Sequence, residues 1–172
     1  QLMQPSEPLR YKYIMEKDGK TEEFEKYPSD TTYKYKEMVL INENAKPKIT
    51  DYKVWNNDGD FTQETFKGKK LIIIIKNGTD LNGASLAEIR SLINSVKDSG
   101  VEPLILTSNS DAEIQEIRKS YLLDVPYYFA DGTVLKTISR SNPGIWLLED
   151  GTVKGKWHYN TTPDKEGVLS KL

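Results

Sequence analysis

A run of five apolar residues at positions 71–75 (Leu-Ile-Ile-Ile-Ile) places the strongest constraint on the fold of this chain. β-Branched side chains favour strands, and a strand that is apolar at every position is typical of one buried on both faces. Such a strand lies in the middle of a sheet that has helices on both sides. The run is also far shorter than the roughly 20 apolar residues that cross a bilayer. The sequence therefore predicts a soluble α/β domain without a transmembrane span.

Amphipathic helices and short strands alternate after this central segment. Residues 84–97 place their leucine, isoleucine and valine side chains on one helical face, and Gly100 ends the helix. Residues 101–106 predict the next strand, and residues 107–111 supply N-cap candidates for a second helix. A helical crossover between two strands implies that the strands are parallel.

Shorter elements complete the pattern of the C-terminal part. They are a strand at 125–129, a short helix at 133–139, and a hairpin formed by 145–148 and 153–158. The Asp-Gly pair at 150–151 is a strong signal for the hairpin turn. After Asn160 the pattern leaves a final helix and a loop both open.

The first 65 residues are more polar and rich in tyrosine. Alternating apolar positions there predict a hairpin or a meander: Leu9, Tyr11 and Tyr13, then Tyr33 and Tyr35. Residues 39–41 and 49–55 are candidates for further strands. We therefore predict a β-rich extension at residues 1–50 and an α/β domain at residues 51–172.

Composition restricts the chemistry of the chain. It contains no cysteine, which excludes disulfides, thiolate metal sites and a cysteine nucleophile. The 24 basic and 26 acidic residues give a net charge of −2, which argues against general nucleic-acid binding. We expect no metal, no cofactor and no nucleic-acid partner. The chain opens without an initiator methionine or a leader, which fits removal of an upstream segment and an arbitrary boundary equally well.

The predicted order of strand, helix, strand, helix, proline turn and hairpin is similar to that of the thioredoxin-like fold. Residues 140–152 (Arg-Ser-Asn-Pro-Gly-Ile-Trp-Leu-Leu-Glu-Asp-Gly-Thr) resemble the segment where that fold carries a cis-proline, an apolar strand and a tight hairpin. The resemblance implies an α/β, thioredoxin-like mixed-sheet sandwich behind the N-terminal β-rich extension. It also implies a cis bond before Pro143.

A narrower resemblance connects this chain with a membrane protein family. Residues 128–131, 135–137, 140–144 and 156–158 resemble the thioredoxin-like region of some bacterial DoxX-family membrane proteins. The match covers roughly residues 50–160. It implies a membrane-associated, extracytoplasmic domain with a membrane-protein subunit as a possible partner.

The thioredoxin-like fold carries its redox Cys-x-x-Cys where the first central strand meets its helix, which corresponds to residues 77–85 here. That loop has no cysteine, so thiol–disulfide chemistry is not implied. The loop could collect an anion on free backbone amides, whereas ordinary capping by Asn82 or Ser85 is the simpler reading.

Five consecutive residues are the candidates for partner binding: Arg140, Ser141, Asn142, Pro143 and Gly144. In the resembled fold the residue before the cis-proline pairs its backbone with an extended peptide, and that residue would be Asn142. On this hypothesis, replacing Asn142 and Pro143 abolishes partner capture and leaves stability nearly unchanged. Arg140 offers donors for a carboxylate or phosphate. Alternatively, it caps a helix or forms an ordinary surface ion pair.

Other residues have competing interpretations. His158, the only histidine, is either an acid–base group or a structural residue. The three tryptophans, Trp55, Trp146 and Trp157, either line a partner surface or pack across strands. The acidic stretch 51–64 fails as a calcium loop because Val54 and Thr65 occupy ligand positions.

These observations favour a redox-inactive interaction module that binds a peptide or protein partner and has no enzymatic activity. One alternative is a cysteine-independent enzyme that acts on a small anionic substrate through Arg140 and carboxylates. Another alternative is a purely structural accessory domain.

Overall fold

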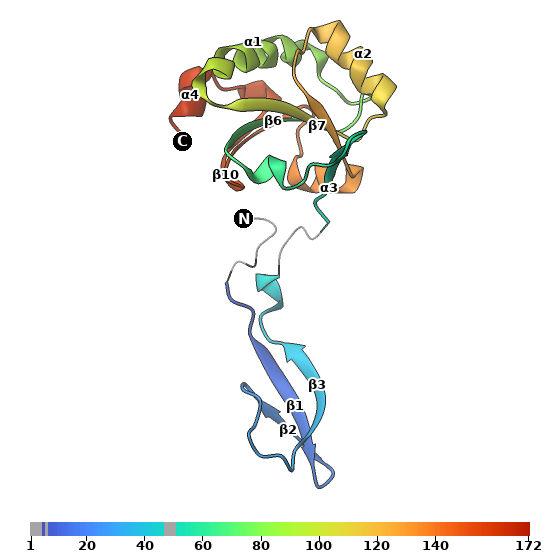
Figure 1. Ribbon diagram of the computed structural model, residues 1–172, viewed down its shortest axis with the longest axis vertical. Coiled ribbons are helices and arrows are strands. Elements are labelled where there is room, and N and C mark those ends of the chain that lie inside the picture. The colour runs from blue at the N-terminus through green and yellow to red at the C-terminus, as the bar shows by residue number, and fades with distance from the viewer. Residues whose placement is uncertain (1–4, 6, 47–50) are drawn as a thin grey trace. The chain divides into compact units, whose positions relative to one another are not determined.

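The computed structural model describes residues 5, 7–46 and 51–172, and the chain divides into two compact units (Figure 1). The units are Gln1–Thr50 and Asp51–Leu172. The structure does not describe the first two positions, 49 and 50, of the candidate strand at 49–55. The first four residues of the predicted β-rich extension also lie outside the described residues. That the two units are independent domains stays a prediction.

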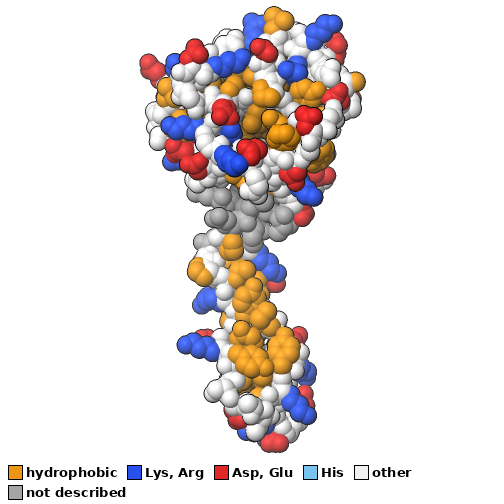
Figure 2. Space-filling model, in the orientation of Figure 1, with side chains coloured by type: hydrophobic (Ala, Val, Ile, Leu, Met, Phe, Trp, Pro, Cys, Tyr) orange, Lys and Arg blue, Asp and Glu red, His pale blue; other side chains and the backbone are white. Residues whose placement is uncertain are grey.

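The N-terminal unit contains a three-stranded antiparallel sheet, in the order β2-β1-β3. Its strands are β1 (Tyr11–Lys17), β2 (Lys20–Phe24) and β3 (Lys34–Leu40). Met15 is buried in this small sheet, whereas Tyr35 and Met38 of β3 are exposed. Figure 2 shows hydrophobic side chains gathered along this unit. Of the two arrangements that the tyrosine pattern left open, the structure contains the hairpin, formed by β1 and β2. β3 pairs with the other side of β1 and does not continue a meander.

The second unit contains a seven-stranded mixed sheet in the order β10-β9-β6-β7-β8-β4-β5. Its strands are β4 (Val54–Asn56), β5 (Gly59–Asp60), β6 (Lys69–Ile75), β7 (Glu102–Thr107), β8 (Tyr127–Ala130), β9 (Gly144–Glu149) and β10 (Thr152–His158). The apolar run at residues 71–75 forms most of β6, which pairs in parallel with β7 and antiparallel with β9. Both the central position of this strand and its parallel pairing with the next one are confirmed.

Four α-helices of this unit connect or flank the strands: α1 (Leu86–Val96), α2 (Asp111–Tyr121), α3 (Gly132–Ile138) and α4 (Lys165–Leu169). In Figure 1, α1 and α2 lie on one side of the sheet and α3 lies on the other. The C-terminal segment that the sequence left open contains the short helix α4. None of the described helices is long and apolar enough to cross a membrane.

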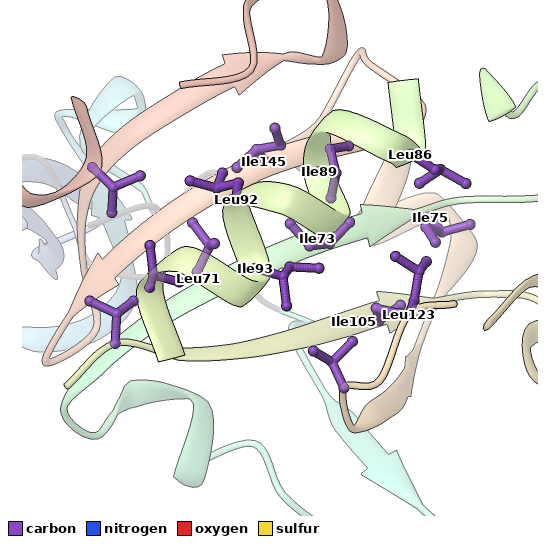
Figure 3. Packing of buried hydrophobic residues seen from close by; sticks show 14 of the residues in the cluster. Leu71, Ile73, Ile75, Leu86, Ile89, Leu92, Ile93, Ile105, Leu123 and Ile145 are labelled. Carbon is purple, nitrogen blue, oxygen red and sulfur yellow. The ribbon is translucent and has the colours of Figure 1, made fainter. Parts of the chain in front are cut away.

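The main hydrophobic core lies between the sheet and α1. Ile73 of β6 and Ile105 of β7 lie under Ile89 and Ile93 of the helix, and all four side chains are fully or almost fully buried (Figure 3). The alternate residues of β6, such as Ile74, are buried as well. The apolar run therefore supplies side chains to both sides of the sheet, as its composition predicts.

Local signals set the ends of α2. Ser110 accepts a hydrogen bond from the Glu113 amide, and the Glu113 carboxylate accepts one from the Ser110 amide, which is a complete capping box. The helix ends at Tyr121 and is capped by Leu122, whose backbone is left-handed with φ of 54° and which is 68% exposed. A leucine in this conformation is unfavourable because its Cβ crowds the following carbonyl.

Replacing Leu122 by glycine is expected to raise the free energy of unfolding by about 0.5–1 kcal/mol, since glycine adopts left-handed backbone without the Cβ penalty. Urea unfolding followed by tryptophan fluorescence is a suitable measurement, because all three tryptophans lie in the second unit. Leu122→Ala is the control, as it shortens the exposed side chain but keeps the Cβ. Equal stability of the glycine and alanine variants would contradict the strain argument.

Candidate functional site

The predicted binding residues lie at one end of the sheet, beside a polar hollow of about 300 Å³. The end of β6, α3, the turn before β9 and the end of β10 all contribute to it. The lining residues are Lys76, Asn77, Asp80, Lys136, Arg140, Ser141, Asn142, His158 and Tyr159. We call this hollow the cationic hollow, because three of its side chains are lysine or arginine.

Asn142 joins this turn to the loop that follows β6. Its side-chain oxygen accepts a hydrogen bond from the Lys76 amide at 2.9 Å, and its side-chain nitrogen donates one to the Asn77 carbonyl at 2.9 Å. Its own carbonyl accepts a hydrogen bond from the Asn82 amide at 3.0 Å. The side chain is buried, with only 6% of the residue exposed. The Asn142 carbonyl, part of the backbone that was expected to pair with a peptide, is therefore already paired within the chain.

The neighbours of Asn142 are also part of the architecture. The bond between Asn142 and Pro143 is cis, as the resemblance implied. The Ser141 hydroxyl donates to the Pro143 carbonyl and accepts from the Tyr159 amide at 3.1 Å. A Cβ added to Gly144 would collide with the Ser139 side chain, so this position has no room for another residue. Arg140 is the only exposed member of the five predicted residues.

Three cations of the hollow differ in their surroundings. Lys76 donates from its Nζ to the carbonyls of Ser139 at 3.1 Å and Arg140 at 3.0 Å, so its ammonium is held in place. Lys136 and Arg140 are exposed, and neither has an ion pair with any residue that the structure describes. The alternative of an ordinary surface ion pair at Arg140 therefore finds no support. Asp80 is the only carboxylate of the lining.

Sequence reasoning missed Lys76, Lys136 and Asp80 as members of this site. The spacing of four residues between Lys136 and Arg140 was no signal, because Arg140 lies beyond α3 and Ser139 between them has extended backbone. Lys76 and Asp80 lie more than 55 residues before Arg140, and only the folding of the sheet brings them together.

His158 is an exposed residue at the rim of the same hollow. Its Nδ1 accepts a hydrogen bond from the Asn160 amide at 3.2 Å, and its ring lies 4.1 Å from the Tyr159 ring, measured between centroids. Because Nδ1 is an acceptor, the neutral ring carries its proton on Nε2. No cluster of three histidine, cysteine or acidic side chains suited to a metal ion occurs within the described part of the chain.

The loop at 77–85 shows the simpler of its two predicted roles. The Asn82 side chain accepts a hydrogen bond from the Ser85 amide at 3.1 Å and so caps the turn Gly83–Ser85 before α1. The Gly78 amide donates to the side chain of Asn109 at 3.0 Å. A Cβ at Gly83 would collide with Tyr121, so this part of the loop packs closely against α2.

Two of the three tryptophans pack within the fold, whereas the predicted role of a partner surface stays a prediction for the third. Trp146 is 7% exposed, and the Lys156 ammonium lies 4.0 Å from its ring centroid. Trp157 packs against the main core. Trp55 differs, because it is 40% exposed at the sheet edge, with its ring 6.5 Å from that of Phe129.

Comparison with solved structures shows that the second unit has a thioredoxin-like fold. A putative thioredoxin from Neisseria meningitidis has a TM-score of 0.52 at 15% identity, with 69% of this chain and 83% of that chain covered. The thioredoxin domain of a thiol-disulfide oxidoreductase from Bacteroides vulgatus gives 0.51 at 16% identity, with 63% and 88% covered. Copper-bound ScoI from Arabidopsis thaliana gives 0.50 at 11% identity, with 70% and 94% covered.

Sequence comparison adds one match, in the N-terminal unit. Residues 9–41, which contain β1, β2 and β3, match a family described as a domain of unknown function (DUF8463). The search of curated proteins found no significant match. The predicted α/β, thioredoxin-like fold class is confirmed by the structure neighbours, and at these identities they establish the fold alone. With no cysteine, this chain cannot exchange thiols and disulfides through its own residues.

Proposed function

We propose that this chain is a redox-inactive, thioredoxin-like interaction module that binds an acidic group of a peptide or protein partner in the cationic hollow. The observation that carries the proposal is the pair Lys136 and Arg140, two exposed cations that form no ion pair with any described carboxylate and lie beside a third cation, Lys76. A carboxylate or phosphate would accept hydrogen bonds from the Arg140 guanidinium and gain attraction from both lysines.

The surroundings of the cations support this function. Asn142 and Ser141 hold the turn that carries Arg140 through partly buried hydrogen bonds, so the backbone of the site is already ordered before a partner binds. Preorganisation of this kind lowers the entropic cost of association. Peptide recognition in this proposal therefore depends on charged side chains at the hollow and not on strand pairing at the Asn142 carbonyl.

The cellular context is part of the proposal. We infer from the resemblance to DoxX-family proteins that the domain lies outside the cytoplasm and associates with a membrane-protein subunit. An antibody against this chain is expected to detect it in the membrane fraction of native cells. Crosslinking in those membranes is expected to capture a membrane protein together with it. Recovery of the chain only from the cytoplasmic fraction would contradict this part.

The binding test uses the isotope-labelled full chain in nuclear magnetic resonance titrations. The probes are a glutamate-rich peptide, its glutamine counterpart and inorganic phosphate, all at constant ionic strength. We expect the glutamate peptide to shift signals around Arg140, and the double variant Lys136→Gln/Arg140→Gln to weaken its binding about tenfold or more. Saturable binding of phosphate with the same dependence would instead favour the alternative of a small anionic substrate.

The matched control is Lys165→Gln/Lys171→Gln, which removes two exposed cations near the C-terminus and leaves the hollow intact. Equal weakening by both double variants would show that only the net charge matters. That result, or equal binding of the glutamate and glutamine peptides, would overturn the proposed site.

A further inference from the structure

A second hollow, of about 270 Å³, lies where β4 turns away from β8. β4 pairs with β8 only through Val54 and Trp55, opposite Ala130 and Phe129. Tyr127 and Tyr128, the first two residues of β8, therefore have no strand partner on that side in the described part of the chain. The hollow lies beside this open edge, and none of its lining residues belongs to the cationic hollow.

Arg118 of α2 is the cation of this second hollow. Its guanidinium lies over the Tyr127 ring, 4.8 Å from the ring centroid. Within the part of the chain that the structure describes, its Nε is inaccessible to solvent and has no hydrogen-bond partner, and no carboxylate forms an ion pair with it. A donor that is withheld from water without an acceptor is unusual in folded proteins.

One of the two carboxylates of the lining, Asp111, accepts hydrogen bonds from other donors. Asp111 accepts a hydrogen bond from the Tyr127 hydroxyl at 2.6 Å and another from the Gln115 amide at 2.7 Å. The bond to Asp111 raises the pKa of Tyr127, so the phenol keeps its proton and remains a donor. Each oxygen of Asp111 thus has another donor, and among the described residues Asp111 forms no ion pair with Arg118, whose planar cation lines the hollow.

The other walls restrict the anion that would fit. Asp58 and Asp111 both line the hollow, and their negative charges oppose a doubly charged group such as phosphate. A carboxylate carries one charge and matches the two-pronged guanidinium geometry. Aromatic rings of Tyr127 and Phe129, which lie edge to face at 5.9 Å between centroids, provide an apolar wall beside it.

We propose that this second hollow binds the C-terminal carboxylate of an extended peptide. The carboxylate pairs with Arg118, and the preceding residues lie along the open edge of β8 at Tyr127 and Tyr128. Backbone pairing at a sheet edge together with capture of a terminal carboxylate is an established mode of peptide recognition. The ligand class is a peptide with a free carboxyl terminus and an apolar last side chain, and the site is independent of the proposed function of the cationic hollow.

The test compares two probes that differ only in the terminal group: N-acetyl-alanyl-alanyl-leucine as the free acid and as the C-terminal amide. Titration of the isotope-labelled full chain is expected to shift signals of α2 and β8 with the free acid. The amide is expected to bind about 10- to 100-fold more weakly, because it offers no charged acceptor to the guanidinium. Equal affinity for acid and amide would overturn the proposal, as would the absence of binding by the acid.

Variants of the full chain assign the effect to Arg118. Arg118→Met is expected to weaken binding of the free acid to the level of the amide, and Arg118→Lys to restore it only in part, because lysine lacks the planar fork. Lys119→Met removes the neighbouring cation, which does not line this hollow, and is expected to leave binding unchanged. Circular dichroism confirms that each variant is folded. Unaltered binding by Arg118→Met, or loss of binding in the Lys136→Gln/Arg140→Gln variant, would overturn the assignment.

Discussion

Replacing Ile73 by alanine is expected to lower the free energy of unfolding of the second unit by about 2–5 kcal/mol. Ile73 lies at the centre of β6, opposite Ile105 on one side and Ile145 on the other, and its side chain is fully buried. Because strands on both sides hold the backbone and α1 covers the side chain, the surroundings cannot collapse into the cavity (Figure 3). The loss therefore combines the transfer free energy of the missing carbons with the cost of the cavity.

The measurement is urea unfolding of the full chain followed by tryptophan fluorescence, which reports on the second unit alone. Ile73→Val is the graded control and is expected to cost about 0.5–1.5 kcal/mol, since it removes one methylene and keeps β-branching. An alanine variant as stable as the valine variant would mean that this part of the core relaxes freely, contrary to the packing described above.

Replacing Asn142 by leucine, which has a similar size, is expected to lower the free energy of unfolding by about 2–4 kcal/mol. The substitution removes the acceptor of the Lys76 amide and the donor to the Asn77 carbonyl, and it leaves these backbone groups without partners under a buried side chain. This expectation replaces the hypothesis that Asn142 is a contact residue whose loss leaves stability unchanged.

Asn94→Leu provides the matched control for the same chemical change, because Asn94 is an exposed residue of α1. Its stability is expected to stay within about 0.5 kcal/mol of the parent chain. Loss of stability in Asn142→Leu but not in Asn94→Leu would identify the side-chain hydrogen bonds as the cause. If both variants were as stable as the parent, the hydrogen bonds of Asn142 would be energetically unimportant and the turn before β9 would have to be held by other contacts.

Elements with strong local signals were predicted closely. The sequence range 101–106 corresponds to β7 (Glu102–Thr107), and the N-cap candidates at 107–111 include Ser110, which caps α2. The hairpin at Asp150 and Gly151 is formed by β9 and β10. These signals succeeded because an N-cap and a two-residue turn depend on atoms within a few residues of one another.

Weak local signals were less informative. The candidate strand at 49–55 overlaps only a three-residue strand, β4 (Val54–Asn56), whose partner β8 lies more than 70 residues later in the chain. The exposure of Trp55 also depends on this pairing, because it lies near the edge of the sheet. Strand partners and edge positions are long-range properties, and tryptophan alone does not indicate which face of a strand is covered.

The sequence by itself determined the chemistry that is excluded and the centre of the fold. The absence of cysteine removes thiol chemistry, and the run at 71–75 requires a strand buried on both faces. It also identified Arg140 and its neighbours as the part of the chain to examine. These conclusions depend on residue type and local periodicity, which are already complete in the linear chain.

Only the tertiary structure decided what those neighbours do. Ser141 and Asn142 are turned inward to satisfy backbone groups, whereas Arg140 meets Lys76 and Lys136 at the hollow. In the same way, the Nε of Arg118 has no acceptor among the described residues, while the carboxylate of Asp111 accepts from Tyr127 and Gln115. Whether a polar side chain supports the fold or faces a ligand depends on which hydrogen-bond partners the fold places next to it, and those partners come from distant parts of the chain.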